Sequence, residues 1–192
     1  MTLMIHEVIN EDMFSLNLED YNLTFDDGLY SQYYYSHRFE KIDTDKTYFI
    51  SSGIVCNNNK QSDLFFPCHQ AHQQAFKGDF SQYMTIDQIK ELSEQYRTNI
   101  GCHSHSHTRL TSFSTLKEKV DYIKRDTEMM LEWFNKNLNF VPTSFCFPYN
   151  DDMDGLYKGL LKGYGFTEFH GRERTPIEKL LHDAHQSVFH DA

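Results

Sequence analysis

Short runs of apolar and aromatic residues, each closed by turn-forming or polar residues, recur along this chain and predict β-strands. We expect strands at residues 21–25, 46–51, 98–102, 143–147 and 165–169. Between them lie segments whose apolar residues recur every three or four positions, the spacing of one helix face. We expect helices at residues 85–96, 115–138, 155–162 and 176–188, two of them opened by the capping-box pairs Thr85/Gln88 and Thr115/Glu118. This alternation predicts an α/β fold with a mainly parallel sheet or barrel, whose active site follows the carboxyl ends of the strands.

The length and charge of the chain narrow the range of functions. Its 192 residues contain no Pro-, Gly- or Ser-rich linker, so we expect one domain over residues 1–192. Lys and Arg number 18 and Asp and Glu number 28, which gives a formal net charge of −10. That charge argues against a nucleic-acid surface and against docking by charge alone on an anionic membrane. No stretch approaches the roughly 20 apolar residues of a transmembrane helix.

Cysteine usage and the N-terminal residues bear on the compartment. The four cysteines contain no CxxC pair, so we expect four reduced thiols rather than a zinc knuckle. The first residues, MTLMIHEVINEDMF, lack the basic region and apolar run of a signal peptide. Both features favour a cytoplasmic protein.

The first segment with distinctive chemistry is Leu23-Thr24-Phe25-Asp26-Asp27-Gly28, which ends a predicted strand. Two adjacent carboxylates repel one another, which raises the pKa of one of them unless a cation intervenes. A metal ion would resolve this conflict by taking one Asp as a ligand and leaving the other as a base. The alternative is an Asp-Gly turn with a solvated partner, and the segment alone favours that alternative.

The second segment, Gly101 to His107, holds three histidines in five residues. An extended segment would point His103, His105 and His107 to one face. A single helical turn would bring only His103 and His107 together, with His105 pointing away. The second geometry suits one divalent ion with a carboxylate as third ligand and water as fourth. A polar loop without an ion is the other interpretation.

The third segment, Phe145-Cys146-Phe147-Pro148-Tyr149-Asn150, is by itself a strand stopped by proline. Together, however, the three segments resemble the polysaccharide deacetylases, also called NodB-homology or carbohydrate esterase family 4 enzymes. The blocks Thr24–Gly28, His103–His107 and Phe145–Tyr149 follow the family's order T-F-D-D-G, H-[ST]-x-x-H and aromatic-x-x-P-Y. The resemblance spans about two thirds of the chain, and its first two blocks are specific.

This resemblance implies a fold, a metal and a set of roles. The fold would be α/β, a distorted or incomplete (β/α) barrel, because the chain is short for a complete one of about 250 residues. The metal would be one divalent ion, most commonly zinc, held by Asp27, His103 and His107. Asp26 would be the general base that activates the attacking water. The backbone amide of Tyr149 would hold the oxyanion, and we expect Pro148 beside it to border the substrate.

Several positions depart from the family pattern. Many members have arginine where this chain has Cys146, and that arginine often orients the base. Arg172 and Arg174 are candidates to replace it, and they are also candidates to bind a substrate phosphate. The family's last block supplies a histidine as general acid, which His182 in Leu180-Leu181-His182-Asp183 superficially matches. A solvated helix histidine is the alternative for His182, and His170 is a second candidate acid.

Two further features lie outside the three blocks. His69 and His72, spaced i and i+3, could bind metal or could lie on a helix that borders the cleft. The tyrosines that follow the first block could stack on a sugar or could pack as one face of a helix.

The predicted function is therefore hydrolysis of an N-acyl group, most simply acetyl, from an amino sugar or glycan. The cytoplasmic prediction places this reaction in the synthesis of a surface polysaccharide such as an O-antigen or capsule. The alternatives are a catalytically silent glycan-binding module and a deformylase or deacetylase of a small nitrogen compound.

Overall fold

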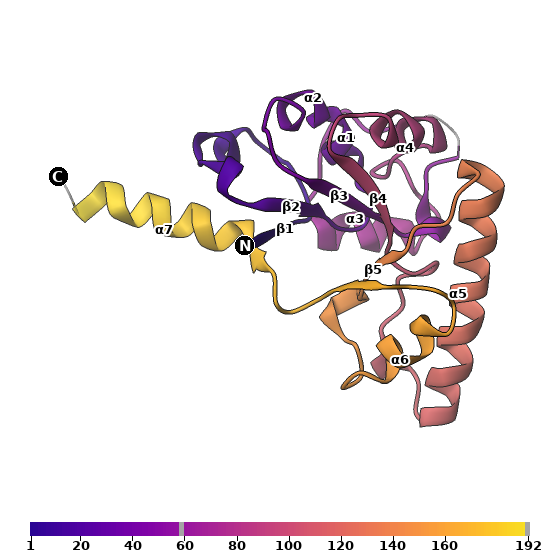
Figure 1. Ribbon diagram of the computed structural model, residues 1–192. Helices are drawn as coiled ribbons and strands as arrows, with labels where there is room; N and C mark the ends of the chain where they lie inside the picture. Colours follow the sequence, from indigo (N-terminus) through magenta and orange to yellow (C-terminus); the bar gives the residue numbers. More distant parts are fainter. Residues whose placement is uncertain (58–59, 191–192) are drawn as a thin grey trace.

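The computed structural model describes residues 1–57 and 60–190 and contains one seven-stranded parallel sheet (Figure 1). Its strands are β1 (Thr2–Ile5), β2 (Asn22–Phe25), β3 (Lys46–Ile50), β4 (Thr98–Cys102), β5 (Ser144–Cys146), β6 (Glu168–His170) and β7 (Thr175–Pro176). The strand order is β6-β5-β4-β3-β2-β1-β7, and every neighbouring pair is parallel. In the described part of the chain no ladder joins β6 to β7, so the curled sheet remains open. The predicted incomplete (β/α) barrel is confirmed.

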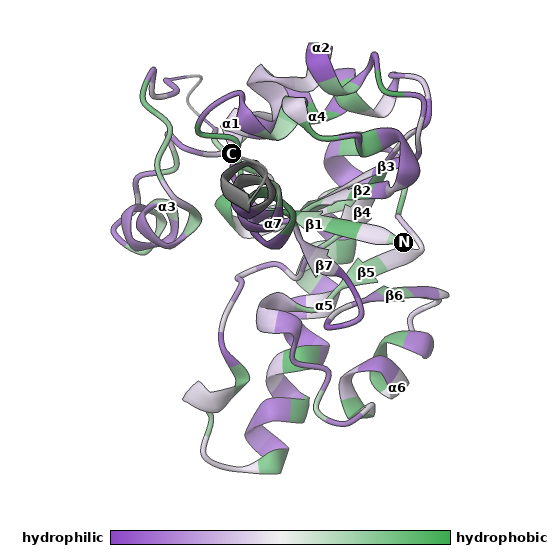
Figure 2. Cartoon of the chain, turned by 90° about the vertical axis from the view of Figure 1, so that its left-hand side faces the viewer, coloured by the Kyte–Doolittle hydropathy of each residue, from purple (hydrophilic) through white to green (hydrophobic). Residues whose placement is uncertain are grey.

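Helices cover the sheet from two sides. They are α1 (Tyr30–Tyr34), α2 (Ser36–Phe39), α3 (Cys68–Ala75), α4 (Ile86–Ser93), α5 (Leu116–Leu138), α6 (Leu156–Lys162) and α7 (Ile177–His190). Figure 2 shows α1, α2 and α4 on one side of the strands and α5 and α6 on the other. Both predicted capping boxes form, at Thr85 before α4 and at Thr115 before α5. Helix α7 projects away from the rest of the molecule (Figure 1).

The predicted elements match the structure except at its edges. Four of the five predicted strands coincide with β2, β3, β4 and β5 to within one residue, whereas β6 lies further along the chain than expected. Strands β1 and β7, which have four and two residues, were not predicted. The single domain over residues 1–192 stays a prediction. In the described residues no helix is both long and apolar enough to cross a membrane.

Close packing between β3 and β4 fixes the position of the second block. The β-carbon of any residue other than glycine at position 101 would lie 2.4 Å from the Phe49 ring, so only glycine fits there. Phe49 is fully buried, and Cys102 and His103 follow directly after Gly101. A larger residue at this point would therefore displace the histidine loop as well as the strand.

Candidate metal centre and catalytic pocket

A cavity of about 350 Å³ lies at the carboxyl ends of the strands. All three sequence blocks reach it: Asp26 and Asp27 follow β2, His103 and His107 follow β4, and Phe147, Tyr149 and Asn150 follow β5. His6, which follows β1, and residues of α3 complete its wall. The prediction that the chemistry gathers at strand ends is thus correct for these segments.

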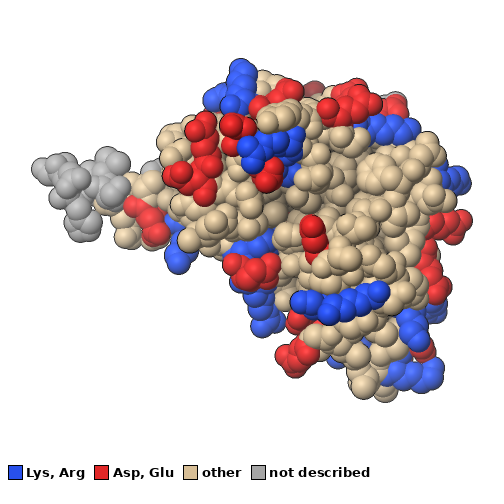
Figure 3. Space-filling view, in the orientation of Figure 1, with Lys and Arg blue, Asp and Glu red and all other residues tan. Residues whose placement is uncertain are grey.

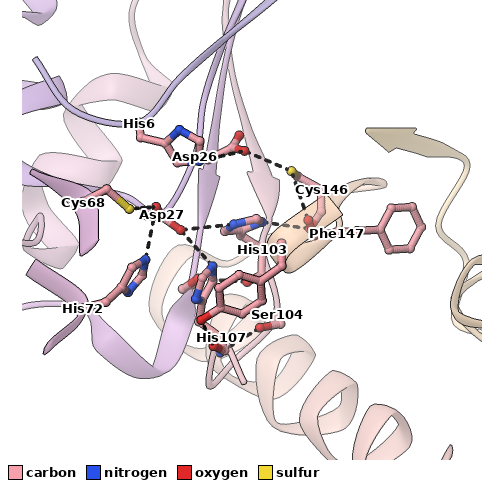
Figure 4. Close-up of polar contacts among 12 residues, drawn as sticks. His6, Asp26, Asp27, Cys68, His72, His103, Ser104, His107, Cys146 and Phe147 are labelled. Atoms are coloured by element: carbon pink, nitrogen blue, oxygen red, sulfur yellow. Dashed lines mark hydrogen bonds and ion pairs between the residues drawn. The ribbon is translucent and has the colours of Figure 1, made fainter. Parts of the chain in front are cut away.

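Asp27 lies at the centre of the imidazoles (Figure 4). Its Oδ1 is 3.2 Å from Nε2 of His103 and 3.0 Å from Nε2 of His107. Asp27 has a φ of 76° and Gly28 a φ of 77°, a left-handed turn that directs the carboxylate away from the strand. Such backbone strain in a buried Asp is typical of a functional site.

The histidine loop is neither an extended strand nor a helical turn. Ser104 and His107 have φ values of 63° and 49°, so the chain bends sharply between them. The Ser104 hydroxyl accepts a hydrogen bond of 2.9 Å from the His107 N–H, and the bend brings the two rings of His103 and His107 to the same carboxylate. His105 points elsewhere and bonds to the Ser52 hydroxyl at 2.9 Å.

Asp126 on α5 fixes the backbone of the histidine loop by hydrogen bonds. Its carboxylate accepts hydrogen bonds from the N–H of His105 at 2.7 Å and from the N–H and hydroxyl of Ser106 at 2.9 and 2.6 Å. Asp126 is buried, so these donors offset the cost of burying its charge. Asp126 lies on the apolar face of α5 with Ile123 and Met130, and an acidic residue at such a position is the local signal for this contact.

The two motif histidines carry opposite pKa shifts. Burial alone lowers the pKa of the His103 ring, but Cys146 and Asp27 outweigh it and raise that pKa well above its usual range, so a metal ion would have to displace its proton. Burial lowers the pKa of His107 to about 4, against the attraction of Asp27, so its ring is neutral at pH 7 and has a lone pair to donate. Burial alone raises the pKa of the Asp27 carboxyl, but His107 and His103 outweigh it and hold the pKa well below its usual range. A buried, ionised carboxylate draws positive charge into this site.

The residues present fit a divalent metal ion. Among the described residues, Asp27 Oδ1 is a buried carboxylate oxygen without a hydrogen-bond donor. It faces imidazole nitrogens, and carboxylate oxygen with imidazole nitrogen is a donor set typical of zinc. The other ring nitrogen of His103 contacts the Cys146 carbonyl at 2.8 Å, the kind of outer contact that orients a ligating histidine.

Asp26, in contrast, is held by an arginine. Nη1 and Nη2 of Arg174 donate to Asp26 Oδ1 and Oδ2 at 2.7 and 2.8 Å, a bidentate ion pair in which both side chains are buried. Burial alone raises the pKa of the Asp26 carboxyl, but the charge and hydrogen bonds of Arg174 outweigh it and lower the pKa below its usual range. Asp26 is therefore ionised beside the candidate metal ligands, as a general base requires.

Arg174 has no donor left for a substrate. Besides Asp26 it donates to the Thr24 hydroxyl at 3.0 Å, the Gly171 carbonyl at 3.2 Å and the Asn150 side chain at 3.2 Å. Its Nη2 also lies 3.0 Å from Cys146 Sγ, so the small cysteine leaves room for this guanidinium. The placement of Arg174 agrees with a role in orienting Asp26 and not with binding of a substrate phosphate.

Tyr149 follows Pro148 in a left-handed conformation, with a φ of 56°. Tyr149 lines the pocket together with Asn150. Its ring lies 4.7 Å from that of His107, and the Arg109 guanidinium stacks 3.7 Å above its other side. Tyr149 is thus placed where the family resemblance implies an oxyanion donor.

Four other predicted site residues do not line the cavity: Pro148, which is buried, Arg172, His182 and His170. Arg172 is exposed and donates to the Asn150 carbonyl at 3.1 Å, beside a neighbouring hollow. His182 is exposed on α7, where it contacts Gln186 at 3.0 Å, and the structure does not bring it to the pocket. His170 packs against the Phe49 ring at 4.9 Å, and burial lowers its pKa.

His6 is the wall residue that sequence reasoning missed. Its Nε2 lies 3.9 Å from Asp26 Oδ2, and its side chain is 31% exposed, so it faces both the base and the cavity. It follows β1, a strand that the sequence did not predict. The predicted role of His182 as general acid stays a prediction, and His6 is a histidine that does line the cavity.

Comparison with known proteins supports the fold. No protein-family model and no curated protein sequence matches the chain. Among solved structures, IcaB from Ammonifex degensii aligns with a TM-score of 0.66 and 16% identity, over 92% of this chain and 84% of that one. The deacetylase PplD from Streptococcus pyogenes, in complex with acetate, aligns with a TM-score of 0.55 and 15% identity, over 85% and 63%. A polysaccharide deacetylase from Bacillus cereus aligns with a TM-score of 0.58 and 13% identity, over 88% and 56%.

This chain therefore spans less than two thirds of the length of the last two proteins. The shared part includes the sheet whose strand ends carry the three sequence blocks. At this level of identity the similarity concerns the fold, and it agrees with the resemblance that the motifs predict. The chain has the fold of the polysaccharide deacetylases of the NodB-homology class.

Proposed function

We propose that this protein is a metal-dependent carbohydrate deacetylase that removes an N-acetyl group from an amino sugar. The observation that carries the proposal is the pair Asp26 and Asp27, which are adjacent in sequence and held in two different environments. Asp27 faces imidazoles, as a metal ligand does, whereas Asp26 is kept ionised by Arg174. The fold shared with the Streptococcus pyogenes deacetylase in complex with acetate supports the reaction class.

Asp27, His103 and His107 would hold the metal ion, and their donor atoms favour zinc. A bound divalent ion would polarise the acyl carbonyl and make a water nucleophilic near neutral pH. Asp26 accepts the proton of the attacking water. The guanidinium of Arg174 keeps that carboxylate ionised and fixes its orientation, so that it can act at neutral pH.

Two further groups of the chain complete the reaction. The N–H of Tyr149 donates to the oxygen that becomes negative when the carbonyl is attacked. The amine leaves only if it receives a proton, and His6, 3.9 Å from Asp26, is the group we assign to this transfer. Asp26 takes a proton from water and His6 delivers one to the leaving amine, and both groups lie on the same side of the pocket. The aromatic rings of Phe76, Phe147 and Tyr149 line the cavity and offer apolar faces for a sugar.

The substrate context remains that of surface polysaccharide synthesis in the cytoplasm. Cys68, Cys102 and Cys146 are free thiols in the structure, which suits a reducing compartment. Figure 3 shows Lys and Arg scattered among Asp and Glu, without a continuous basic area on that face, so a polyanionic partner is disfavoured there. Arg172, exposed beside the hollow next to the pocket, is the residue that could meet a carrier phosphate.

The test is acetate and formate release from a panel of N-acylated amino sugars, free, nucleotide-linked and polymeric. We expect acetate release, and we expect Asp26→Asn to reduce kcat by about 10²–10⁴-fold with the metal content unchanged. Asp183→Asn, an exposed change on α7, is the matched control and should retain full activity. No release from any sugar would favour the silent glycan-binding module. Release only from small amides would favour a deformylase or deacetylase of a small nitrogen compound. Recovery of the native protein outside the cytoplasm would refute the location.

A further inference from the structure

His72 on α3 approaches Asp27 from beside His107, at the carboxylate oxygen that the two motif histidines do not face (Figure 4). Its Nε2 lies 3.3 Å from Asp27 Oδ2. The donor atoms of Asp27, His72 and His107 all lie within 4.8 Å of one another. Two ligands bonded at about 2.0–2.2 Å to one tetrahedral zinc ion lie about 3.3–3.6 Å apart, which matches the 3.3 Å between His72 Nε2 and Asp27 Oδ2.

The free ring nitrogen of His72 is not needed as a hydrogen-bond donor to Asp27. Cys68, one turn earlier on α3, already donates its thiol to Asp27 Oδ2 at 3.0 Å. Among the described residues His72 Nε2 is buried and has no hydrogen-bond partner, even though it lies 3.3 Å from a carboxylate. A buried nitrogen without a partner is costly unless something else binds it.

The rest of the His72 ring is held in place as that of a ligand is. Its Nδ1 lies 3.0 Å from the hydroxyl of Tyr83, which is 1% exposed. This contact fixes which nitrogen faces the site, as the Cys146 carbonyl does for His103. The ring also stacks on His107, with centroids 4.3 Å apart and planes 11° apart.

We propose that His72 is a fourth protein ligand of the metal, so that the ion is held by three imidazoles and Asp27. This inference rests on the proposed function, because it assumes that the ion of that reaction binds at Asp27. It goes beyond the three-ligand set that the sequence motifs imply. Its chemical consequence is that α3, outside the three motif blocks, contributes to metal affinity.

The experiment measures the Zn²⁺ dissociation constant of the full chain by competition with a chromophoric chelator. We compare the wild type with His72→Gln, His107→Gln and His69→Gln, since exposed His69 lies one turn from His72 on the same helix. We expect His72→Gln to weaken binding at least as much as loss of an outer-shell partner, about 10–100-fold, and His69→Gln to have no effect. X-ray absorption of the zinc-loaded wild type should give three imidazoles, and His72→Gln should give two.

The outcomes separate this inference from the proposed function. If His107→Gln loses zinc while His72→Gln binds as tightly as the wild type, the fourth ligand is refuted and the reaction stands. If the wild type binds no zinc, both are refuted. If His72→Gln fails to fold by circular dichroism, the imidazole count of the wild type decides: two imidazoles overturn the inference and three support it.

Discussion

Removing Arg174 tests the central electrostatic argument, because this residue holds the base without touching the candidate metal ligands. We consider Arg174→Met, which keeps much of the length of the side chain and removes the charge. In this variant the Asp26 carboxylate stays buried but loses the two hydrogen bonds that Arg174 donates to it at 2.7 and 2.8 Å in the wild type. Breaking one side of a buried ion pair costs about 3–5 kcal/mol of unfolding free energy.

The sign of the pH dependence follows from the direction of the pKa shift. In the wild type the pKa of Asp26 is lowered because Arg174 outweighs the effect of burial. That ion pair contributes stability above the ordinary pKa of Asp, and the contribution is lost as pH falls through the folded-state pKa. The stability difference between wild type and Arg174→Met should therefore be fully present at pH 7 and shrink in acid.

The same change acts on catalysis. Without Arg174, burial raises the pKa of Asp26, so the acidic limb of the kcat profile moves to higher pH while zinc content stays constant. Arg172→Met is the matched control, since Arg172 lies two residues away and is exposed. Urea unfolding at several pH values and kcat measured across pH give the two readouts. An Arg174→Met enzyme with an unmoved acidic limb, or an Arg172→Met enzyme with the same loss, would show the reasoning to be wrong.

Three other substitutions test the remaining contacts. His6→Gln should lower kcat about 10²–10⁴-fold, whereas His182→Gln should leave kcat unchanged; the reverse result would restore His182 as the acid. Asp126→Asn should lower the unfolding free energy by about 1.5–3 kcal/mol, the value of a hydrogen bond to a charged group, and weaken zinc binding; urea unfolding at wild-type stability would contradict this. Tyr83→Phe should weaken zinc binding about 10–100-fold by releasing the His72 ring, and chelator competition showing wild-type affinity would exclude this positioning role.

The sequence predicts the centre of this molecule better than its edges. The central strands are runs of apolar residues that end at breakers, so their positions follow from composition, as for β3 and β4. The residues of the three blocks lie directly after such strands, so their positions in the fold are predicted equally well. The topology then brings Asp27, His103 and His107 together because β2 and β4, which lie on either side of β3 in the parallel sheet, present their carboxyl ends at the same rim.

The parts that could not be predicted depend on long-range packing. Nothing local marks His72 as facing Asp27, because its direction is set by where α3 lies in space. The bend between Ser104 and His107 is imposed by Asp126 on a distant helix, so neither local geometry that we considered for this segment was correct. The motif identifies the residue types and not the backbone path.

The two strands that escaped prediction flank the catalytic base. Strands β1 and β7 pair with one another at one edge of the sheet, and each is next to a residue that contacts Asp26: His6 follows β1 and Arg174 precedes β7. A buried carboxylate is stabilised by a cation beside it, and that cation can come from any segment of the chain that folds next to it. Arg174 can therefore meet Asp26 from the end of the chain, provided that the residue at the family's arginine position, Cys146, is small enough to admit it. The pairing of β7 with β1 therefore helps to place the guanidinium of Arg174 beside Asp26, the proposed base.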